Sequence, residues 1–66
     1  MRVTINGTSH ETADGLSLAQ AVGVLTTARS GVAAAVNGAV IRRVAWDTTA
    51  LADGDEVEVL TAVQGG

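Results

Sequence analysis

The chain has no cysteine and no proline among its 66 residues. Without cysteine it can form neither a disulfide nor a thiolate metal site, and nothing indicates an oxidising compartment. A chain of this length forms one domain, close to the lower limit for a hydrophobic core without covalent staples.

Basic residues and long apolar runs are also scarce. All four basic residues are arginines, and the formal net charge is −3 at pH 7. Because nucleic acids are bound through clustered Lys and Arg, we expect no nucleic-acid partner. The longest apolar run, Val32–Val36, is far too short to span a bilayer. Strand-like sequence begins at Met1 and leaves no room for a signal peptide, so we expect a soluble cytoplasmic protein without a membrane partner.

Catalytic motifs are missing as well. His10 is the only histidine, so no histidine cluster is available for a metal. Ser9, His10 and Glu11 are neighbours in a predicted strand, where successive side chains point to opposite faces and cannot form a triad. There is no phosphate-binding loop or dinucleotide fingerprint. We therefore expect no catalytic residue, no metal and no bound cofactor, and a protein that is a substrate of enzymes.

The first third of the chain predicts a hairpin. Val3 and Ile5 alternate with polar residues, as in a half-buried strand. Asn6-Gly7 is a strong signal for a tight turn in which both central residues have positive φ. Residues 8–12 then return as a polar edge strand, with Glu11 as a charge that discourages edge-to-edge pairing.

A helix is predicted next, because Ser17 and Gln20 form a Ser-x-x-Gln capping box. The helix has one apolar stripe, formed by Leu18, Ala21, Val22 and Leu25. We expect the helix to end near Ala28–Arg29. Gly23 inside it costs about 1 kcal/mol relative to Ala, and close packing against a sheet is the reason we suggest for it.

The second half predicts another hairpin. Val32–Val36 has the pattern of a buried strand, Asn37-Gly38 repeats the turn signal, and Val40-Ile41 returns. Arg42-Arg43 is predicted to be an exposed pair, with a role in binding a partner as the alternative. Trp46 is the only aromatic residue, and its large apolar area predicts a core or rim anchor.

A turn and a final strand complete the chain. Residues 47–51 predict a short turn of helix capped by Asp47, and Asp53-Gly54-Asp55 predicts a turn. In the strand that follows, Val57 and Val59 share one face, while Glu58 and Leu60 share the other. Four acidic residues gather here: Asp53, Asp55, Glu56 and Glu58. They form either a solvated turn and strand edge or a patch that steers a basic partner.

This order of elements predicts an α+β fold, with one helix on one face of a mixed sheet. We expect residues 1–61 to form the domain and residues 62–66 to form a flexible tail. The tail ends in Gly65-Gly66, and a glycine pair ends only about 0.5% of chains by chance. A terminal α-carboxylate has a pKa of about 3.5, so at neutral pH it is an ionised nucleophile that can attack ATP. Four extended residues reach about 13 Å, far enough to enter the pocket of another protein.

Several segments together resemble the ThiS family, the sulfur carriers of thiamin biosynthesis. The similar segments are Val3-x-Ile5-Asn6-Gly7, Val36-Asn37-Gly38, Val40-Ile41-x-Arg43-x-x-Trp46, Asp53-Gly54-Asp55-Glu56-Val57-Glu58-Val59 and the end from Thr61 to Gly66. The similarity spans the whole chain, and it implies the β-grasp (ubiquitin-like) roll, in which the last strand runs parallel beside the first. Arg42 departs from the pattern, since many members have proline there, and Gly23 is a second departure.

The resemblance implies partners and roles. A ThiF-type adenylating enzyme would use ATP to activate the carboxylate of Gly66. A sulfur donor, such as a cysteine desulfurase relay, would then displace AMP to leave a thiocarboxylate. Thiazole synthase would take that sulfur to build the thiazole ring. The tail-recognition residues would be Gly65, Gln64, Val63 and Ala62, and Leu60 and Glu58 are the candidates for the surface that contacts partners.

Other functions fit the same residues. The small subunit of molybdopterin synthase has the same fold and tail chemistry, but it tends to be longer and often has proline before its terminal segment. A ubiquitin-like modifier would form amide links to lysines of other proteins. A plain β-grasp interaction module would not need its terminal glycines.

Overall fold

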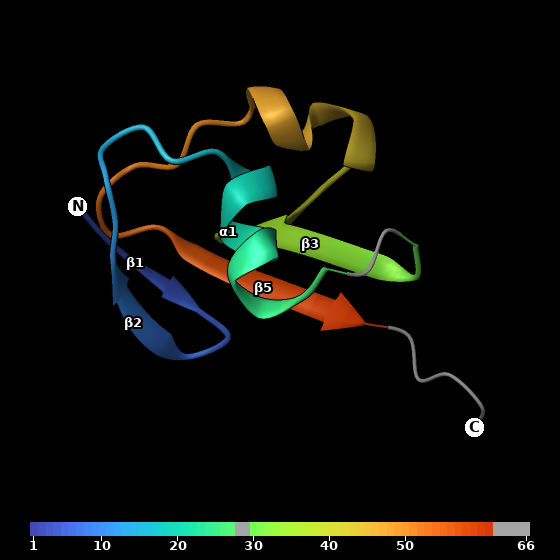
Figure 1. The fold of residues 1–66 in the computed structure, drawn as a ribbon, viewed down its shortest axis with the longest axis horizontal. Coiled ribbons are helices and arrows are strands. Elements are labelled where there is room, and N and C mark those ends of the chain that lie inside the picture. Colours follow the sequence, from blue (N-terminus) through green and yellow to red (C-terminus); the bar gives the residue numbers. More distant parts are fainter. Residues whose placement is uncertain (28–29, 62–66) are drawn as a thin grey trace.

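The C-terminal strand lies at the centre of one mixed sheet (Figure 1). The computed structural model describes residues 1–27 and 30–61, and the order of the five strands in that part is β2-β1-β5-β3-β4. The elements are β1 (Arg2–Ile5), β2 (Thr8–Glu11), α1 (Leu18–Leu25), β3 (Val32–Val36), β4 (Ala39–Ile41), the 3-10 helix η1 (Arg43–Thr48) and β5 (Glu56–Thr61). β5 runs parallel to β1 and antiparallel to β3. The predicted α+β fold of the β-grasp type is confirmed.

Both predicted hairpin turns are present. Asn6 and Asn37 have φ of 49° and 50°, and the glycine after each also has positive φ. Asparagine and glycine tolerate this left-handed conformation, which tight two-residue hairpins require. The turns join β1 to β2 and β3 to β4 in antiparallel register.

The helix begins as predicted and ends earlier than predicted. Ser17 Oγ accepts from the backbone N–H of Gln20, and the Gln20 side chain accepts from the backbone N–H of Ser17. The helix ends at Leu25, because Thr26 is extended, with φ −152° and ψ 148°. The predicted end near Ala28–Arg29 is therefore wrong, and those two residues lie outside the described part of the chain. β-branched threonines are weak helix formers, which favours the early end.

The helix packs on the sheet through the first part of its predicted stripe. Leu18, Ala21 and Val22 are buried, whereas Leu25 is 45% exposed. Gly23 is exposed, and a Cβ placed on it would meet nothing within 4 Å. Close packing is thus the wrong explanation for Gly23. In the described part of the chain, no helix has the length and apolar character needed to cross a membrane.

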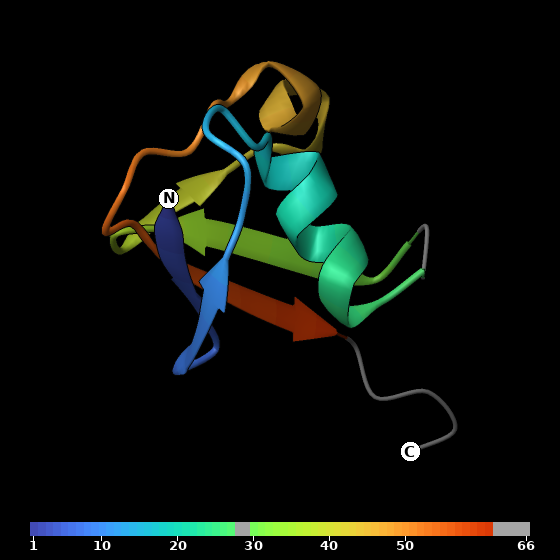
Figure 2. The ribbon, with the colours of Figure 1, turned by 60° about the vertical axis from the view of Figure 1, so that its left-hand side comes forward.

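The core lies between one face of the sheet and the two helices, which Figure 2 shows on the same side of the sheet. Its buried residues are Val3, Ile5, Leu18, Ala21, Val22, Ala34, Trp46, Leu51, Val57 and Val59. β3 has the predicted bounds, but Ala34 is its only buried residue. The prediction of a buried strand therefore holds only in part: Val32 and Val36 are half-buried against the core, and within the described residues no helix covers the other face of the sheet.

Trp46 is the predicted anchor, and it determines where the second helix forms. It is 5% exposed, and its indole N–H donates to the carbonyl of Ile41 at 2.8 Å. η1 therefore spans residues 43–48, one turn before the predicted 47–51. Asp47 lies inside η1 and is exposed, so its predicted capping role is wrong.

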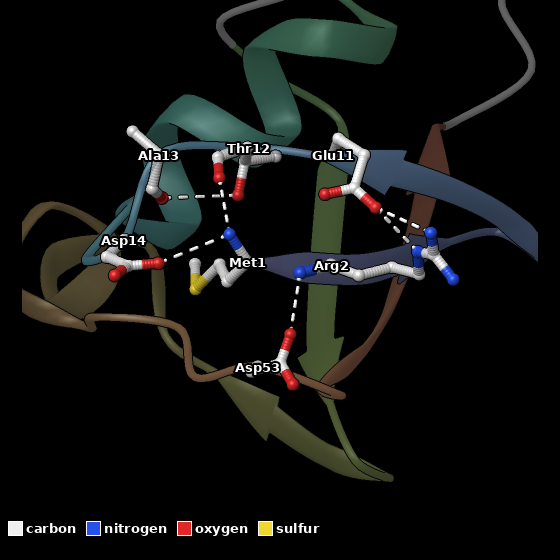
Figure 3. A network of polar contacts seen from close by, with 7 residues as sticks. All are labelled: Met1, Arg2, Glu11, Thr12, Ala13, Asp14 and Asp53. Carbon is white, nitrogen blue, oxygen red and sulfur yellow. Dashed lines mark hydrogen bonds and ion pairs between the residues drawn. The ribbon is translucent and has the colours of Figure 1, made fainter.

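A polar network fixes the start of β1 (Figure 3). The terminal ammonium of Met1 donates to the carbonyl of Thr12 at 2.7 Å and to Asp14 Oδ1 at 3.2 Å. The backbone N–H of Arg2 donates to Asp53 Oδ1 at 2.7 Å. The Arg2 guanidinium pairs with Glu11 across the β1–β2 hairpin. β1 is thus attached at its first residues to both the β2 side and the loop that leads into β5.

Candidate functional site at the end of β5

The predicted tail follows directly from the central strand. Thr61 is the last residue of β5, and the tail residues Ala62, Val63, Gln64, Gly65 and Gly66 lie outside the described part of the chain. Their assigned roles therefore stay predictions. β5 ends on the side of the molecule away from the N-terminus (Figure 1).

Val57 and Val59 of β5 are buried, so the strand that precedes the predicted tail is anchored in the core. The alternation predicted for this strand is confirmed. Glu58 and Leu60 are exposed on the opposite, uncovered face, and Leu60 is 70% exposed.

Glu58 and Leu60 take part in a shallow hollow on that face. In register, Leu60 lies beside Ala33 of β3, and Glu58 lies beside Ala35. Val40 of β4 lies on the far side of Ala35. These five residues and Ala34 line one hollow, which we call the open-face patch. The small alanine side chains leave a depression between Leu60 and Val40, which can accept an apolar side chain of a partner. A positive charge next to that side chain could pair with Glu58.

The acidic cluster has two parts with different roles. Asp53 accepts the backbone N–H of Arg2. Asp55 accepts the backbone N–H of Ala52 at 2.8 Å and the side-chain amide of Asn37 at 3.0 Å. These two carboxylates therefore stabilise the predicted turn, in which Gly54 has φ +89°. Asp53 is itself exposed, and Glu56 and Glu58 are the exposed carboxylates on β5, where they could steer a basic partner.

The predicted arginine pair is exposed beside η1. The Arg43 guanidinium lies over the Trp46 ring, 4.8 Å from its centroid. Such a cation–π contact at the surface contributes about 0.5–1 kcal/mol. Arg43 thus covers one face of the buried indole.

Two asparagines have a role that the turn signal did not predict. Asn6 Oδ1 accepts the backbone N–H of Val59 at 2.7 Å, and its Nδ2 donates to the carbonyl of Val59 at 3.0 Å. Asn37 Oδ1 accepts the backbone N–H of Glu56 at 2.9 Å. Both side chains bind β5 from the hairpin turns on either side of it. The Asn-Gly turn motif could not predict these contacts, because Asn6 and Val59 are 53 positions apart in the sequence.

The rest of the described chain offers no catalytic grouping. Within residues 1–27 and 30–61, no three His, Cys, Asp or Glu side chains gather as metal ligands would. His10 is half-buried on β2, opposite Val3 of β1. A second, open hollow is lined by Met1, Arg2, Thr4, Glu11, Asp53 and Gly54. Its Arg2 guanidinium pairs with Glu11, and its Asp53 carboxylate accepts the backbone N–H of Arg2.

The ThiS family model matches residues 3–66, which includes the predicted tail. The chain belongs to the ThiS family. A comparison with curated proteins finds no match.

Two solved structures show how closely this ThiS-family chain follows known relatives. The crystal structure of the thiamine biosynthesis protein (ThiS) from Geobacter metallireducens is 35% identical, covers all of both chains and gives a TM-score of 0.79. The NMR solution structure of a thiamine biosynthesis protein from the same organism is 35% identical with a TM-score of 0.80, covering all of this chain and 88% of that one. The sequence resemblance is thereby confirmed over the full length.

Proposed function

We propose that this ThiS-family chain is a sulfur carrier of thiamin biosynthesis whose working group is the carboxylate of Gly66. The observation that supports this most directly is the family match, because it extends to residue 66 and so includes the terminal glycine pair. The relative from Geobacter metallireducens, 35% identical over the full length, is a thiamine biosynthesis protein. A chain without cysteine can hold sulfur covalently in this way, through its own carboxyl end.

The proposed chemistry has two steps on the carrier. In the active site of a ThiF-type adenylating enzyme, a carboxylate oxygen of Gly66 attacks the α-phosphorus of ATP, and pyrophosphate leaves. Sulfide, supplied through a sulfur donor such as a cysteine desulfurase relay, then attacks the carbonyl carbon of the acyl-adenylate and displaces AMP. One oxygen is thus replaced by sulfur, giving a thiocarboxylate. Thiazole synthase takes this sulfur for the thiazole ring.

The architecture supports this role because the five residues after Thr61 are attached to a strand that is held firmly in the folded domain. β5 is paired on both sides and buries Val57 and Val59, so its position is fixed by the core. Five residues follow Thr61, and when extended they can span about 17 Å. A partner can therefore bind the body at its surface and receive Gly66 in a separate pocket. Gly65 has no side chain to obstruct a narrow entrance.

The open-face patch is the surface we assign to partner contact. It lies on the strand that leads into the tail, so a partner that covers Leu60 and Glu58 also meets the root of the tail. The adenylating enzyme and thiazole synthase act on the same carboxyl end at different times. We therefore expect them to compete for this face.

Intact mass spectrometry tests the proposal. The carrier is incubated with a ThiF-type adenylating enzyme, ATP and sulfide, and we expect a mass gain equal to the replacement of one oxygen by sulfur. The chain lacking Gly66 is the matched control, and its mass should not change. An unchanged mass of the full chain, with an enzyme that modifies another carrier in parallel, would contradict the proposal.

A pull-down separates this function from its nearest relative. We expect thiazole synthase to retain the carrier and the large subunit of molybdopterin synthase not to retain it. Retention by the molybdopterin synthase subunit alone would overturn the assignment to thiamin biosynthesis and leave the thiocarboxylate chemistry in place.

A further inference from the structure

The β1 side of β5 is completed by a side chain and not by the β1 backbone. The last backbone bond between the two strands runs from the N–H of Asn6 to the carbonyl of Val57, at 2.9 Å. The chain then reverses at the Asn6-Gly7 turn. The next pairing position on β5, at Val59, is filled by the Asn6 carboxamide, which accepts at 2.7 Å and donates at 3.0 Å. A carboxamide carries an acceptor oxygen and N–H donors in one plane, so its oxygen and one N–H can replace one rung of the ladder.

Asn37 holds the opposite end of the strand with one backbone bond and one side-chain bond. Its backbone N–H donates to the carbonyl of Glu56 at 2.7 Å, and its Oδ1 accepts the N–H of Glu56 at 2.9 Å. The two hairpin turns therefore hold β5 at its first residue and near its last. Asn37 acts where the strand enters the sheet, and Asn6 acts where the strand leaves it.

Beyond Val59, the described part of β5 is paired on one side only. Leu60 and Thr61 face Ala33 and Val32 of β3, whereas the register with β1 ends at Val57. Among the described residues, Asn6 is thus the last group that holds the strand on its β1 side. Without it, the end of β5 would depend on β3 alone.

We propose that Asn6 is a positioning residue for the C-terminal tail. By holding Val59, it fixes where and in which direction the chain leaves the body, so that a partner docked on the open-face patch meets the tail at a constant place. This inference rests on the proposed function, because it concerns delivery of the Gly66 carboxylate. If the end of β5 opens for part of the time, only the molecules with a closed strand end can bind the partner. The apparent affinity for the partner then falls in proportion to the closed fraction.

The test compares Asn6→Gly with Asn37→Gly. Glycine adopts positive φ readily, so both variants keep the turn. Asn6→Gly loses the two side-chain bonds to Val59, and Asn37→Gly loses the side-chain bond to Glu56 together with the one to Asp55. In a steady-state assay of thiocarboxylate formation by the adenylating enzyme, we expect Asn6→Gly to raise the KM for the carrier about fivefold, the factor that one net hydrogen bond represents. We expect kcat to stay the same, since a bound tail is oriented by the enzyme. Asn37→Gly should leave both constants unchanged.

Amide hydrogen exchange gives a readout that does not depend on the chemistry of the tail. In Asn6→Gly, the amides of Val59 and Leu60 should exchange faster than in Asn37→Gly, after both rates are corrected for global stability. Asn6→Asp, which keeps an acceptor for the Val59 N–H but loses the donor, should fall between the wild type and Asn6→Gly. It also replaces Asn6→Gly if that variant does not fold.

Equal KM values for the two glycine variants, with a wild-type carrier that forms thiocarboxylate normally, would overturn the role of Asn6 alone. Equal exchange rates at Val59 and Leu60 would do the same. A wild-type carrier that gains no sulfur would instead overturn the proposed function, and the positioning role with it.

Discussion

Gly23 and Gly54 both have open space where a Cβ would lie, but they differ in backbone conformation. A Cβ on either residue would meet nothing within 4 Å. Gly54 has φ +89° in the turn before β5, whereas Gly23 lies inside α1. Since there is no steric obstacle at either place, the backbone alone decides what an added side chain does.

We expect Gly23→Ala to stabilise the protein by about 1 kcal/mol, because alanine loses less conformational entropy than glycine in a helix. Gly54→Ala should destabilise it by about 1–2 kcal/mol, the cost of placing a Cβ in the left-handed region. Urea denaturation measures both changes as opposite shifts of the midpoint with an unchanged slope. A stabilising Gly54→Ala or a destabilising Gly23→Ala would contradict this explanation.

α1 is a short helix that depends on its cap and its buried side. It has eight residues, fewer than an isolated helix needs to be stable in water. Its first turn is held by the reciprocal bonds between Ser17 and Gln20. Its burial comes from Leu18, Ala21 and Val22. The helix therefore covers the sheet firmly near its start and only loosely near Leu25.

Removing the cap should show how much it contributes. We expect Ser17→Ala to lower the free energy of unfolding by about 1 kcal/mol, since the N–H of Gln20 loses its acceptor. Asp47→Ala is the matched control, because Asp47 is exposed and caps nothing in η1; its effect should stay within about 0.5 kcal/mol. Thermal unfolding followed by circular dichroism compares the two. If Asp47→Ala lowers the free energy of unfolding more than Ser17→Ala does, Asp47 caps a helix after all and this explanation is wrong.

Elements that are set by neighbouring residues could be predicted from the sequence, and those set by distant contacts could not. The capping box and the two Asn-Gly turns are local, and both are present as predicted. η1 lies one turn earlier than predicted because Trp46 reaches back to Ile41 and into the core. The contacts of Asn6 with β5 depend on the strand order, which the family resemblance supplied and the turn motif did not. At the candidate site, the alternation that exposes Glu58 and Leu60 was predicted, but the hollow between them and Val40 was not.

At the scale of the whole molecule, the two faces of the sheet have different surroundings. One face is covered by α1 and η1 and contains the core. The other face has no helix over it in the part of the chain that the structure describes, and it bears the open-face patch next to the end of β5. Several large apolar side chains are exposed in the described chain, but only Val40 and Leu60 among them line that hollow. Val44 is even more exposed, at 85%, yet it lies on η1 outside the patch.

The assignment of the open-face patch to partner contact is tested by threonine substitutions. Threonine is compatible with strands and replaces apolar surface with a hydroxyl group. Since Leu60 and Val40 are 70% and 77% exposed, the double variant Leu60→Thr and Val40→Thr should keep its stability within about 0.5 kcal/mol. We expect it to raise the KM for thiocarboxylate formation by the adenylating enzyme about tenfold, a loss of about 1.4 kcal/mol of binding free energy.

Val44→Thr makes the same chemical change outside the patch and should leave KM unchanged. Competition provides a second measure, because thiazole synthase should slow the adenylation of the wild-type carrier if both enzymes cover the same face. If Val44→Thr weakens adenylation as much as the double variant does, docking depends on general surface hydrophobicity and not on this face. If the double variant has the wild-type KM, the contact surface lies elsewhere on the molecule. The enzyme would then recognise the carrier without the apolar side chains of Leu60 and Val40.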